Sequence, residues 1–383
     1  MFELRPYQIE SVTHAIDFFN NSSKRGGLIV LPTGSGKSLV IASIAKQLND
    51  TVLVFQPSKE ILEQNYKKYL SYGEKASIYS ASFNSKNIGE VTFATIGSVK
   101  SNPDYFKHIK YIIVDECHFV NAKSGMYKDF FKIVGDKILG LTATPYRLNT
   151  DGFGGSMLKF ITRTRPRVFE RLIYYVQNSY LFDQGYLAKL EYFQIKGFDS
   201  SKLRLNTTGA DYTDKSVQNH FKQINFSEIL YKTVSRLIEI GRKNILVFTR
   251  FTDEARHLVS QFNGLAEIVT AETPPKDRDK VINDFKNGKI RIVANVGILT
   301  TGFDFPELET VVLARPTRSL ALYYQMIGRG IRIHPNKETA YIIDLCENYK
   351  RFGKVEDLTI DKTGNDLWFI RGEKRQLTNV YYD

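Results

Sequence analysis

The 383-residue sequence contains only two cysteines, Cys117 and Cys346, and they lie far apart in the chain. Two isolated cysteines supply neither a disulfide framework nor the paired spacing of a structural zinc site. Apolar runs are also short, and none approaches the roughly 18–20 residues that a membrane-spanning helix needs. The opening residues, MFELRPYQIE, lack the features of a secretory signal peptide. We therefore expect a protein of a reducing, cytoplasmic compartment.

Acidic residues are the scarcer charged type, with 41 Asp and Glu against 53 Lys and Arg, so the net charge is +12. Such a surplus favours a polyanionic partner, most often nucleic acid, although charge alone serves solubility equally well. Apolar residues make up 42% and charged residues 25% of the chain, which is an ordinary balance for globular domains. Together with the length, this balance predicts two or three domains with sizeable cores.

The first 150 residues alternate short β-rich runs with amphipathic segments. Helices are predicted at 36–48 and 58–70, the second with Ser58 as N-cap. Strands are predicted at 26–31, 51–57, 91–95, 111–116 and 137–144. Strands that alternate with helices indicate a parallel α/β sheet, which we expect to form a first lobe over residues 1–150.

The regular pattern stops at the glycine-rich stretch 151–156, and 151–225 is expected to be a helical and basic connector. The α/β alternation resumes over 226–350, which we expect to be a second lobe, followed by a tail over 351–383. In that lobe, strands are predicted at 244–249, 289–295, 310–315 and 340–345, and helices at 253–262 and 274–288. The predicted fold is α/β, with two parallel-sheet lobes in tandem.

The stretch LPTGSGKS predicts a phosphate-binding loop between a buried strand and a helix. Gly34 and Gly36 let backbone N–H groups curl around phosphate oxygens, and the helix N-terminus adds its positive end. Lys37 is expected to reach the β- and γ-phosphates of a nucleotide, and Ser38 to hold Mg²⁺. The alternative is an ordinary strand–turn–helix, because a leucine stands where the usual pattern has its first glycine.

A second acidic motif, IIVDECH, strengthens the nucleotide interpretation, since an apolar strand ends there in two consecutive carboxylates. Asp115 at the strand end is suited to holding Mg²⁺ through water, and Glu116 to polarising the water that attacks a γ-phosphate. Acidic residues also end strands simply because loops are solvated. The two motifs together nevertheless predict an ATP-hydrolysing site, because ligands of α/β proteins bind at the carboxyl ends of parallel strands.

The stretch DECH resembles motif II of the superfamily 2 helicases, in which a residue other than glycine often opens the phosphate loop. The other motifs of that family follow in order over nearly residues 1–350. They are LRPYQ, PTGSGKS, FQPSKEILEQ, FATIGSV, LTATP, VFTR, NVGILTTGFDFP and QMIGRGIR. This resemblance implies two RecA-like lobes with the nucleotide, ATP with Mg²⁺, in the cleft between them.

Finer details resemble the bacterial RadD group and the phage UvsW-type and XPB-related DNA helicases, although the cysteine-rich C-terminal region of RadD proteins is missing here. This resemblance implies an ATP-dependent DNA helicase or translocase of a bacterial or phage-infected cell. Its expected substrate is duplex, forked or branched DNA, or single-stranded DNA, and the protein is expected to act as a monomer.

The resemblance also implies roles for individual residues. The implied nucleotide-binding residues are Arg5, Gln8, Pro32, Thr33, Gly34, Ser35, Gly36, Lys37, Ser38, His118, Gly302 and Asp304. The implied catalytic residues are Lys37, Asp115, Glu116, Gln325, Arg329 and Arg332, with Ser38 and Asp115 holding the metal. The implied DNA contacts are Ser58, Lys59, Gln64, Thr95, Thr249, Arg250, Thr300 and Thr301. We expect both arginines of the last motif to lie on one face of a helix that starts near Ser319 and to act as arginine fingers.

Three alternatives stay open. An RNA helicase of the DEAD-box or DEAH type is disfavoured by Cys117 in motif II and by LTATP in motif III. The motor subunit of a restriction system fits the motifs, although the chain shows no nuclease constellation of its own. The third alternative is a nucleotide-gated module that clamps DNA without moving.

Overall fold

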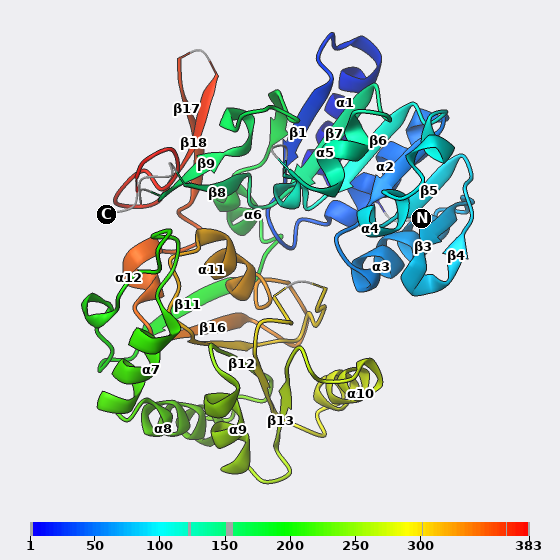
Figure 1. The fold of residues 1–383 in the computed structure, drawn as a ribbon. Helices are drawn as coiled ribbons and strands as arrows, with labels where there is room; N and C mark the ends of the chain where they lie inside the picture. The colour runs from blue at the N-terminus through cyan, green and yellow to red at the C-terminus, as the bar shows by residue number, and fades with distance from the viewer. Residues whose placement is uncertain (1–2, 122–123, 151–155, 301, 365, 382–383) are drawn as a thin grey trace. The chain divides into compact units, whose positions relative to one another are not determined.

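The computed structural model describes residues 3–121, 124–150, 156–300, 302–364 and 366–381. It divides into two compact units that each combine separate stretches of the chain. Unit 1 comprises Met1–Arg147, Leu158–Gln177 and Ile360–Ile370, and unit 2 comprises Leu148–Met157, Asn178–Thr359 and Arg371–Asp383. Each unit is built around one largely or wholly parallel sheet, so the predicted α/β class is confirmed (Figure 1).

Unit 1 contains an eight-stranded sheet with the order β10-β1-β7-β6-β2-β5-β3-β4. Its strands are parallel except for the last pair, β3 and β4. The strand bounds are β1 Gly26–Val30, β2 Val52–Phe55, β3 Ser77–Ser80, β4 Ser85–Lys86, β5 Val91–Ala94, β6 Tyr111–Asp115, β7 Lys137–Thr142 and β10 Arg171–Tyr175. The central strands are buried along their whole length, as expected for a parallel sheet covered on both faces.

Helices of unit 1 pack beside one another, α1 against α2 and α2 against α3, while α4 contacts α5. Their bounds are α1 Pro6–Asn21, α2 Lys37–Leu48, α3 Lys59–Leu70, α4 Ile96–Val99 and α5 Met126–Phe131. Short 3₁₀ turns are η1 Ala81–Phe83, η2 Pro103–Phe106, η3 Cys117–Phe119 and η4 Ile161–Arg163. An aromatic cluster packs α5 against the sheet, since the ring of Phe55 on β2 contacts Tyr127, Phe130 and Phe131 of α5 edge-on.

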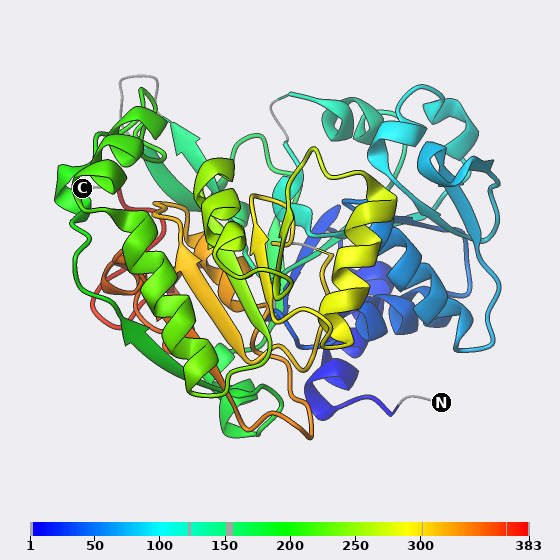
Figure 2. The same cartoon turned by 90° about the horizontal axis from the view of Figure 1, so that it is seen from below.

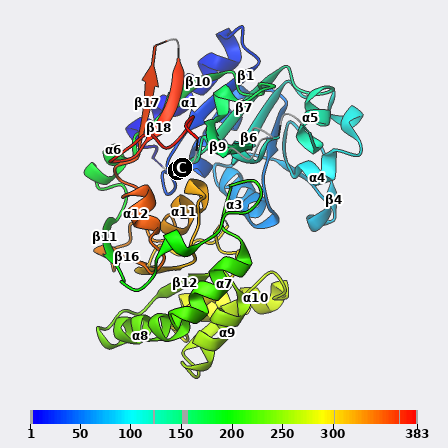
Figure 3. The ribbon, with the colours of Figure 1, turned by 60° about the vertical axis from the view of Figure 1, so that its left-hand side comes forward.

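Unit 2 contains a six-stranded, wholly parallel sheet with the order β11-β16-β15-β12-β14-β13. The strand bounds are β11 Lys189–Gln194, β12 Ile245–Thr249, β13 Ala266–Val269, β14 Ile292–Asn295, β15 Thr310–Ala314 and β16 Thr339–Asp344. The helix bounds are α6 Asn178–Asp183, η5 Ser200–Lys202, α7 Asp214–Gln223, α8 Phe226–Glu239, α9 Thr252–Ser260, α10 Pro275–Lys286, α11 Leu320–Ile327 and α12 Asn348–Phe352. Helices α8 and α9 cover one face of this sheet, which Figure 2 views from their side, and α11 and α12 lie on the other (Figure 3).

Every helix and strand predicted from the sequence is found, with shifts of a few residues at the ends. The N-cap of α3 is confirmed as well, because the Ser58 hydroxyl accepts a hydrogen bond of 3.3 Å from the Ile61 N–H. Helix α11 begins as expected, with the Ser319 hydroxyl accepting from the Leu322 N–H at 3.2 Å. Cys117 and Cys346 are both buried and form no disulfide. Among the described helices, none is long and apolar enough to cross a membrane.

The division of the chain differs from the expected domain bounds, because the segment 151–225 does not form one connector. Strand β10 from this segment pairs in parallel with β1 and belongs to unit 1. Strand β11 pairs in parallel with β16 and belongs to unit 2. The segment is therefore strand as well as helix, and both β10 and β11 extend the edge of a larger sheet. A further two-stranded sheet joins β8 Tyr146–Thr150 and β9 Ser156–Phe160.

The expected tail, 351–383, also contains regular structure. After α12 the chain forms β17 Thr359–Thr363 and β18 Leu367–Arg371, which pair with each other and are drawn in red in Figure 1. The Gln177 side chain gives and accepts one hydrogen bond of 2.9 Å with the backbone of Ile360, as a neighbouring strand does. The Trp368 ring packs edge-on against Tyr175. These contacts attach the β17–β18 segment to unit 1.

Candidate active site

The predicted phosphate loop joins β1 to α2, and its two inner glycines have left-handed backbones, with φ of 81° at Gly34 and 79° at Gly36. Other residues avoid this conformation, and a Cβ at Gly36 would lie only 2.6 Å from the Gln8 amide nitrogen. The Leu31 N–H, by contrast, donates to the Thr142 carbonyl at 3.0 Å and continues the pairing of β1 with β7. The position needs no glycine, which explains why the sequence departs from the usual pattern there.

The start of α1 supports the loop from one side. The Tyr7 hydroxyl and the Gln8 amide both donate to the Ser35 carbonyl, each at 2.7 Å. The other end of the Gln8 amide accepts from the Arg5 N–H at 2.9 Å. Both ends of the Gln8 amide are therefore used inside unit 1, where they hold the loop. An adenine contact by Arg5 and Gln8 stays a prediction.

The acidic motif lies at the carboxyl end of β6, next to the loop. The Lys37 ammonium is 3.4 Å from the Glu116 carboxylate, so the two motifs lie side by side at one edge of the sheet. Glu116 has φ of 47°, a left-handed conformation that costs a non-glycine residue energy and persists mainly at functional sites. Asp115 accepts from the Glu116 N–H at 2.9 Å and from the Asn65 amide at 3.0 Å. Both carboxylates are thus held in fixed orientations.

Hydroxyl groups at and just after the end of β7 connect Glu116 and His118 of motif II to motif III. The His118 Nδ1 lies 2.9 Å from the Thr142 hydroxyl and 3.1 Å from the Thr144 hydroxyl. The Thr142 hydroxyl in turn donates to Glu116 at 3.3 Å, and His118 lies 3.3 Å from the same carboxylate oxygen. Motifs II and III of unit 1 therefore share one buried polar network. A relay from His118 to Gln325 stays a prediction.

The charges of this network are unevenly distributed. Burial and the neighbouring charge of Glu116 raise the pKa of Asp115 to about 7. Burial also acts to raise the pKa of Glu116, but the Lys37 charge and the contact with His118 outweigh it and hold that pKa below its usual range. Glu116 is therefore ionised. Two adjacent carboxyl groups that face one lysine form a donor set that fits a hard divalent cation. No group of three metal-ligating side chains occurs in the described part of the chain.

The predicted site residues of unit 2 lie around the end of α11. This helix ends at Ile327, before Arg329 and Arg332, so the expectation that both arginines share one helix face is wrong. The reason is local, because Gly328 and Gly330 are poor helix formers and surround Arg329. Arg329 donates to the Phe303 carbonyl at 2.6 Å and to the Gln325 carbonyl at 3.4 Å.

Arg332 forms an ion pair with Asp304, so motif VI contacts motif V in unit 2 as the resemblance implies. Gly302 has φ of 73°, the left-handed conformation expected of a tight turn. Arg332 and Asp304 are both partly exposed, with 36% and 39% of their side-chain surfaces accessible. Their pairing leaves the arginine within reach of solvent.

The expected DNA contacts of unit 1 follow β2 and β5. Ser58 and Thr95 are the N-caps of α3 and α4, and the Thr95 hydroxyl lies 2.9 Å from the Ser98 hydroxyl. Lys59 is exposed, with its ammonium 5.3 Å from the centre of the Phe83 ring, and Gln64 is exposed on α3. All four stay predictions.

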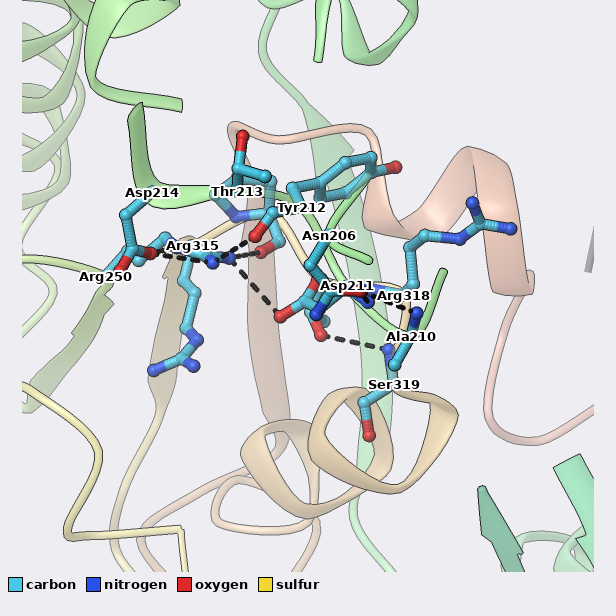
Figure 4. A network of polar contacts seen from close by, with 12 residues as sticks. Asn206, Ala210, Asp211, Tyr212, Thr213, Asp214, Arg250, Arg315, Arg318 and Ser319 are labelled. Atoms are coloured by element: carbon cyan, nitrogen blue, oxygen red, sulfur yellow. Dashed lines mark hydrogen bonds and ion pairs between the residues drawn. The ribbon is translucent and has the colours of Figure 1, made fainter. Parts of the chain in front are cut away.

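The expected DNA contacts of unit 2 are less available. Thr249 is only 1% exposed. The Arg250 guanidinium pairs with Asp211 at 3.3 Å and with Asp214 at 2.8 Å, and it also donates to the Tyr212 and Pro316 carbonyls (Figure 4). Thr249 and Arg250 therefore make their contacts inside unit 2 and do not present their side chains to DNA. Thr300 is half-buried, and Thr301 lies outside the described residues.

Asn65 belongs to the site but was not anticipated from the sequence. Its amide N–H groups donate to the Asp115 carboxylate at 3.0 Å and to the Gln56 side-chain oxygen, Oε1, at 2.8 Å. The signal was present, because Asn65 shares the buried face of α3 with Leu62 and Tyr69. A polar residue on the apolar face of a helix needs a buried partner.

Comparisons with known proteins agree with this arrangement. Residues 1–147 match the family model described as "Type III restriction enzyme, res subunit", and residues 229–334 match the one described as "Helicase conserved C-terminal domain". The chain belongs to the superfamily 2 helicases. A 51.5 kDa protein of a Lactococcus phage is 28% identical over 333 residues, which cover 85% of this helicase chain and 67% of that protein.

Two further relatives carry functional names. The putative ATP-dependent helicase IRC3 of Saccharomyces cerevisiae is 24% identical over 406 residues, covering 97% of this chain and 57% of its own length. The ATP-dependent DNA helicase uvsW of Enterobacteria phage T4 is 24% identical over 362 residues, covering 86% of this chain and 67% of its own length. The chain thus spans 57% to 67% of the length of these three relatives. The finer resemblance to the RadD group stays a prediction.

A solved structure shares the fold. A fragment of a putative HsdR subunit of a type I restriction enzyme from Vibrio vulnificus superposes with a TM-score of 0.67 at 20% identity. The match covers 91% of this chain and 65% of the fragment. Tandem RecA-like units, the fold that the motifs imply, are confirmed.

Proposed function

We propose that this chain hydrolyses ATP and uses the energy to move on DNA and to remodel branched or forked DNA. One observation carries the catalytic part of this proposal. Glu116 is an ionised, half-buried carboxylate held between Lys37 and His118, directly beside a glycine turn shaped to bind phosphate. This combination of a fixed base, a cation and a phosphate cradle is the minimum that hydrolysis of a nucleoside triphosphate requires.

Each residue of unit 1 then has a defined task. The N–H groups of the loop and Lys37 hold the phosphates, and Lys37 exchanges its contact with Glu116 for one with the nucleotide. Glu116 orients the attacking water and receives its proton, while Asn65 keeps Asp115 in place. Ser38 and Asp115 are the residues placed to hold Mg²⁺, which when bound neutralises charge on the phosphates.

Unit 2 supplies the second half of the proposed site. Arg329 and Arg332 are proposed to act on the γ-phosphate when the two units close on the nucleotide, with Gln325 beside them. For this step Arg332 exchanges the carboxylate of Asp304 for the phosphate. Because nucleotide then changes how strongly the units hold each other, a cycle of hydrolysis alternates their grip on DNA.

DNA is the proposed substrate on three grounds. The relative from phage T4 is named a DNA helicase, and the chain carries a net charge of +12. Exposed Lys59 and Gln64, together with the hydroxyls of Ser58, Thr95 and Thr300, are suited to contacts with phosphates that carry no sequence information. We propose that the protein acts as a monomer.

The test is ATP turnover measured without nucleic acid and with single-stranded DNA, duplex DNA, a four-way junction or RNA. We expect strong stimulation by duplex or branched DNA and none with the Lys37→Ala variant. Stimulation by RNA alone would make this an RNA helicase. Turnover by Lys37→Ala at the wild-type rate would remove the loop from the mechanism.

The motor of a restriction system is a second candidate, favoured by the match of residues 1–147 to the res-subunit model. Such a motor moves along duplex DNA without separating its strands. Displacement of a third strand from a DNA triplex reports movement alone, whereas a forked duplex reports strand separation. Triplex displacement without unwinding or junction migration would favour the restriction motor over a remodelling helicase.

A further inference from the structure

A basic groove lies in unit 2, formed by residues outside the helicase motifs. It has a volume of about 540 Å³ and lies between the segment that begins at η5 and the outer face of α7. Its polar walls include Lys202, Arg204, Lys215, Ser216, Asn219 and His220. None of the described lining residues is acidic. The groove is therefore a concentrated positive surface.

The three cations of the groove are not neutralised within the described structure, since no described carboxylate lies within ion-pair distance of Lys202, Arg204 or Lys215. The acidic residues of the same segment are engaged elsewhere. Asp211 and Asp214 bind the Arg250 guanidinium, as Figure 4 shows. Asp199 accepts two hydrogen bonds from Ser201, and its charge acts on Lys202 at longer range. The three cations of the lining therefore outnumber the one carboxylate that acts on them.

An uncharged donor adds to the groove, since Asn219 contributes an amide to its lining. His220 is only 5% exposed, and its Nε2 accepts a hydrogen bond of 3.1 Å from the Asp199 N–H. Its Nδ1 is enclosed, so the ring forms part of the groove wall. A ligand that presents anionic oxygen atoms supplies acceptors for the Asn219 amide and the three cations.

The walls of the groove are rigid and tied to the motor. The Ser216 hydroxyl bonds both the N–H of Arg204 at 3.0 Å and its carbonyl at 3.3 Å, which clamps the two walls together. The Asp211 carboxylate of the same segment accepts a hydrogen bond of 3.1 Å from the N–H of Arg318, which lies two residues before α11 starts. Arg250 adds the connection to motif IV. A ligand in the groove is therefore fixed to the body of unit 2.

We propose that this groove binds the phosphodiester backbone of a nucleic acid and gives unit 2 a grip that is separate from the helicase motifs. The proposal rests on the function proposed above and extends its substrate contacts. Cations combined with polar side chains, and with Leu205 as the one apolar residue among the described lining residues, match a chain of phosphates. The groove lacks the glycine turn with which the loop at Gly36 surrounds a free nucleotide.

The experiment compares the triple variant Lys202→Ala/Arg204→Ala/Lys215→Ala with a matched control, Lys232→Ala/Arg236→Ala/Lys243→Ala. Both remove three exposed cations from unit 2, the control set from α8 and the turn after it. Binding of a labelled DNA duplex is measured without nucleotide over a range of salt concentrations. We expect the groove variant to bind at least about tenfold more weakly and the slope of log K against log salt to fall by about 2–3.

The outcomes separate this proposal from the proposed function. If the wild type binds DNA and the groove variant matches both its affinity and its salt slope, the groove is not a nucleic-acid site. An equal loss in the control variant would show that total charge rather than the groove decides binding, and it would overturn the proposal too. Weaker binding of ATP with unchanged binding of DNA would assign the groove to free nucleotide instead. If the wild type binds no DNA at all, the proposed function fails instead. Thermal unfolding checks that both variants are folded.

Discussion

The phosphate-loop region of unit 1 and the arginine segment of unit 2 hold their charged groups in different ways. In unit 1, the phosphate loop, Asp115 and Glu116 have partners from α1, α3 and β7 that fix them before any nucleotide arrives. In unit 2, Arg332 lies beyond the end of α11 and holds a partly exposed carboxylate. The first region is pre-organised, whereas the second is ready to exchange partners.

The difference has a physical reason. Groups that bind phosphate and orient water save reorganisation energy when they are fixed in advance. A finger that reports the state of the nucleotide must have two arrangements of similar free energy, because only then does the nucleotide shift the balance. The position of Arg332 in the irregular segment that follows the turn 328–330 suits that task. A helix would hold the side chain in one place.

The largest expected effect tests the exchanging side of this comparison. Replacing Arg332 with alanine is expected to slow ATP turnover by about 10³-fold or more, the range typical of arginine fingers. Affinity for ATP should change little, because Lys37 and the loop of unit 1 still hold the phosphates. The measurement is single-turnover hydrolysis, paired with titration of a fluorescent ATP analogue.

Asp304 offers the control for that experiment. Asp304→Asn keeps the shape of the side chain but weakens its hold on Arg332, so turnover should fall far less than in Arg332→Ala. A turnover equal to wild type in Arg332→Ala would remove this residue from the finger role. A parallel loss of ATP affinity would instead make Arg332 a binding group.

The fixed side of the comparison is tested by Glu116→Gln. Glutamine keeps the hydrogen bond with the Thr142 hydroxyl but cannot accept a proton, so turnover should fall by about 10²- to 10⁴-fold. Binding of ATP should persist or strengthen, because a negative charge beside the phosphates is gone. Loss of ATP binding would show that Glu116 shapes the site rather than serving as its base.

A third effect concerns stability. Arg250→Ala removes a guanidinium that is only 9% exposed and leaves Asp211 and Asp214 without their partner. Asp211 is 25% and Asp214 is 70% exposed, so solvent screens the unpaired carboxylates and the cost is about 1–3 kcal/mol, as for a lost hydrogen bond to a charged group. Chemical unfolding should therefore show a clear loss of stability. The control Arg236→Ala breaks an exposed pair with Glu239 and should change stability little. Similar small losses in both variants would mean that the network of Figure 4 does not hold the segment in place.

The sequence predicted most strands and helices because apolar periodicity reports directly which face of an element is buried. It could not assign the segment 151–225, since β10 and β11 are recognised by the sheets they extend and not by their own pattern. The helix end at Ile327 was readable from Gly328 and Gly330. The spacing of three residues between Arg329 and Arg332 favoured a continuing helix, and the two glycines outweigh it.

The candidate site shows the same limit. Motif order placed Lys37 and Glu116 together correctly, because motifs encode local geometry on one sheet edge. Arg250 was expected to contact DNA, but its partners, Asp211 and Asp214, stand more than thirty residues earlier in the chain. A residue type predicts which interactions are possible. Only the fold selects the partner.

The smallest expected effect concerns Lys337, which supports the turn that carries Arg332. Its ammonium is buried and donates to the carbonyls of Leu308 and Gly330, both at 3.0 Å. Burial and the nearby charge of Arg332 lower the pKa of Lys337 to about 8, although Glu309 opposes the shift. The unfolded chain, with an ordinary pKa near 10.5, then binds more protons than the folded protein between about pH 8 and 10.5.

Stability contributed by Lys337 therefore rises with pH through this window, whereas below pH 8 both states are protonated and the contribution is flat. Unfolding free energies of wild type and Lys337→Met, measured from pH 7 to 10, isolate the effect, because Met keeps the stem without the charge. In the Arg332→Ala background the rise should begin at a higher pH, since one cation that disfavours protonation is gone. An unchanged onset would mean that the Arg332 charge lies away from Lys337 in the folded protein. That result would show that Arg332 leaves its position at this turn, independently of what its ion pair with Asp304 shows.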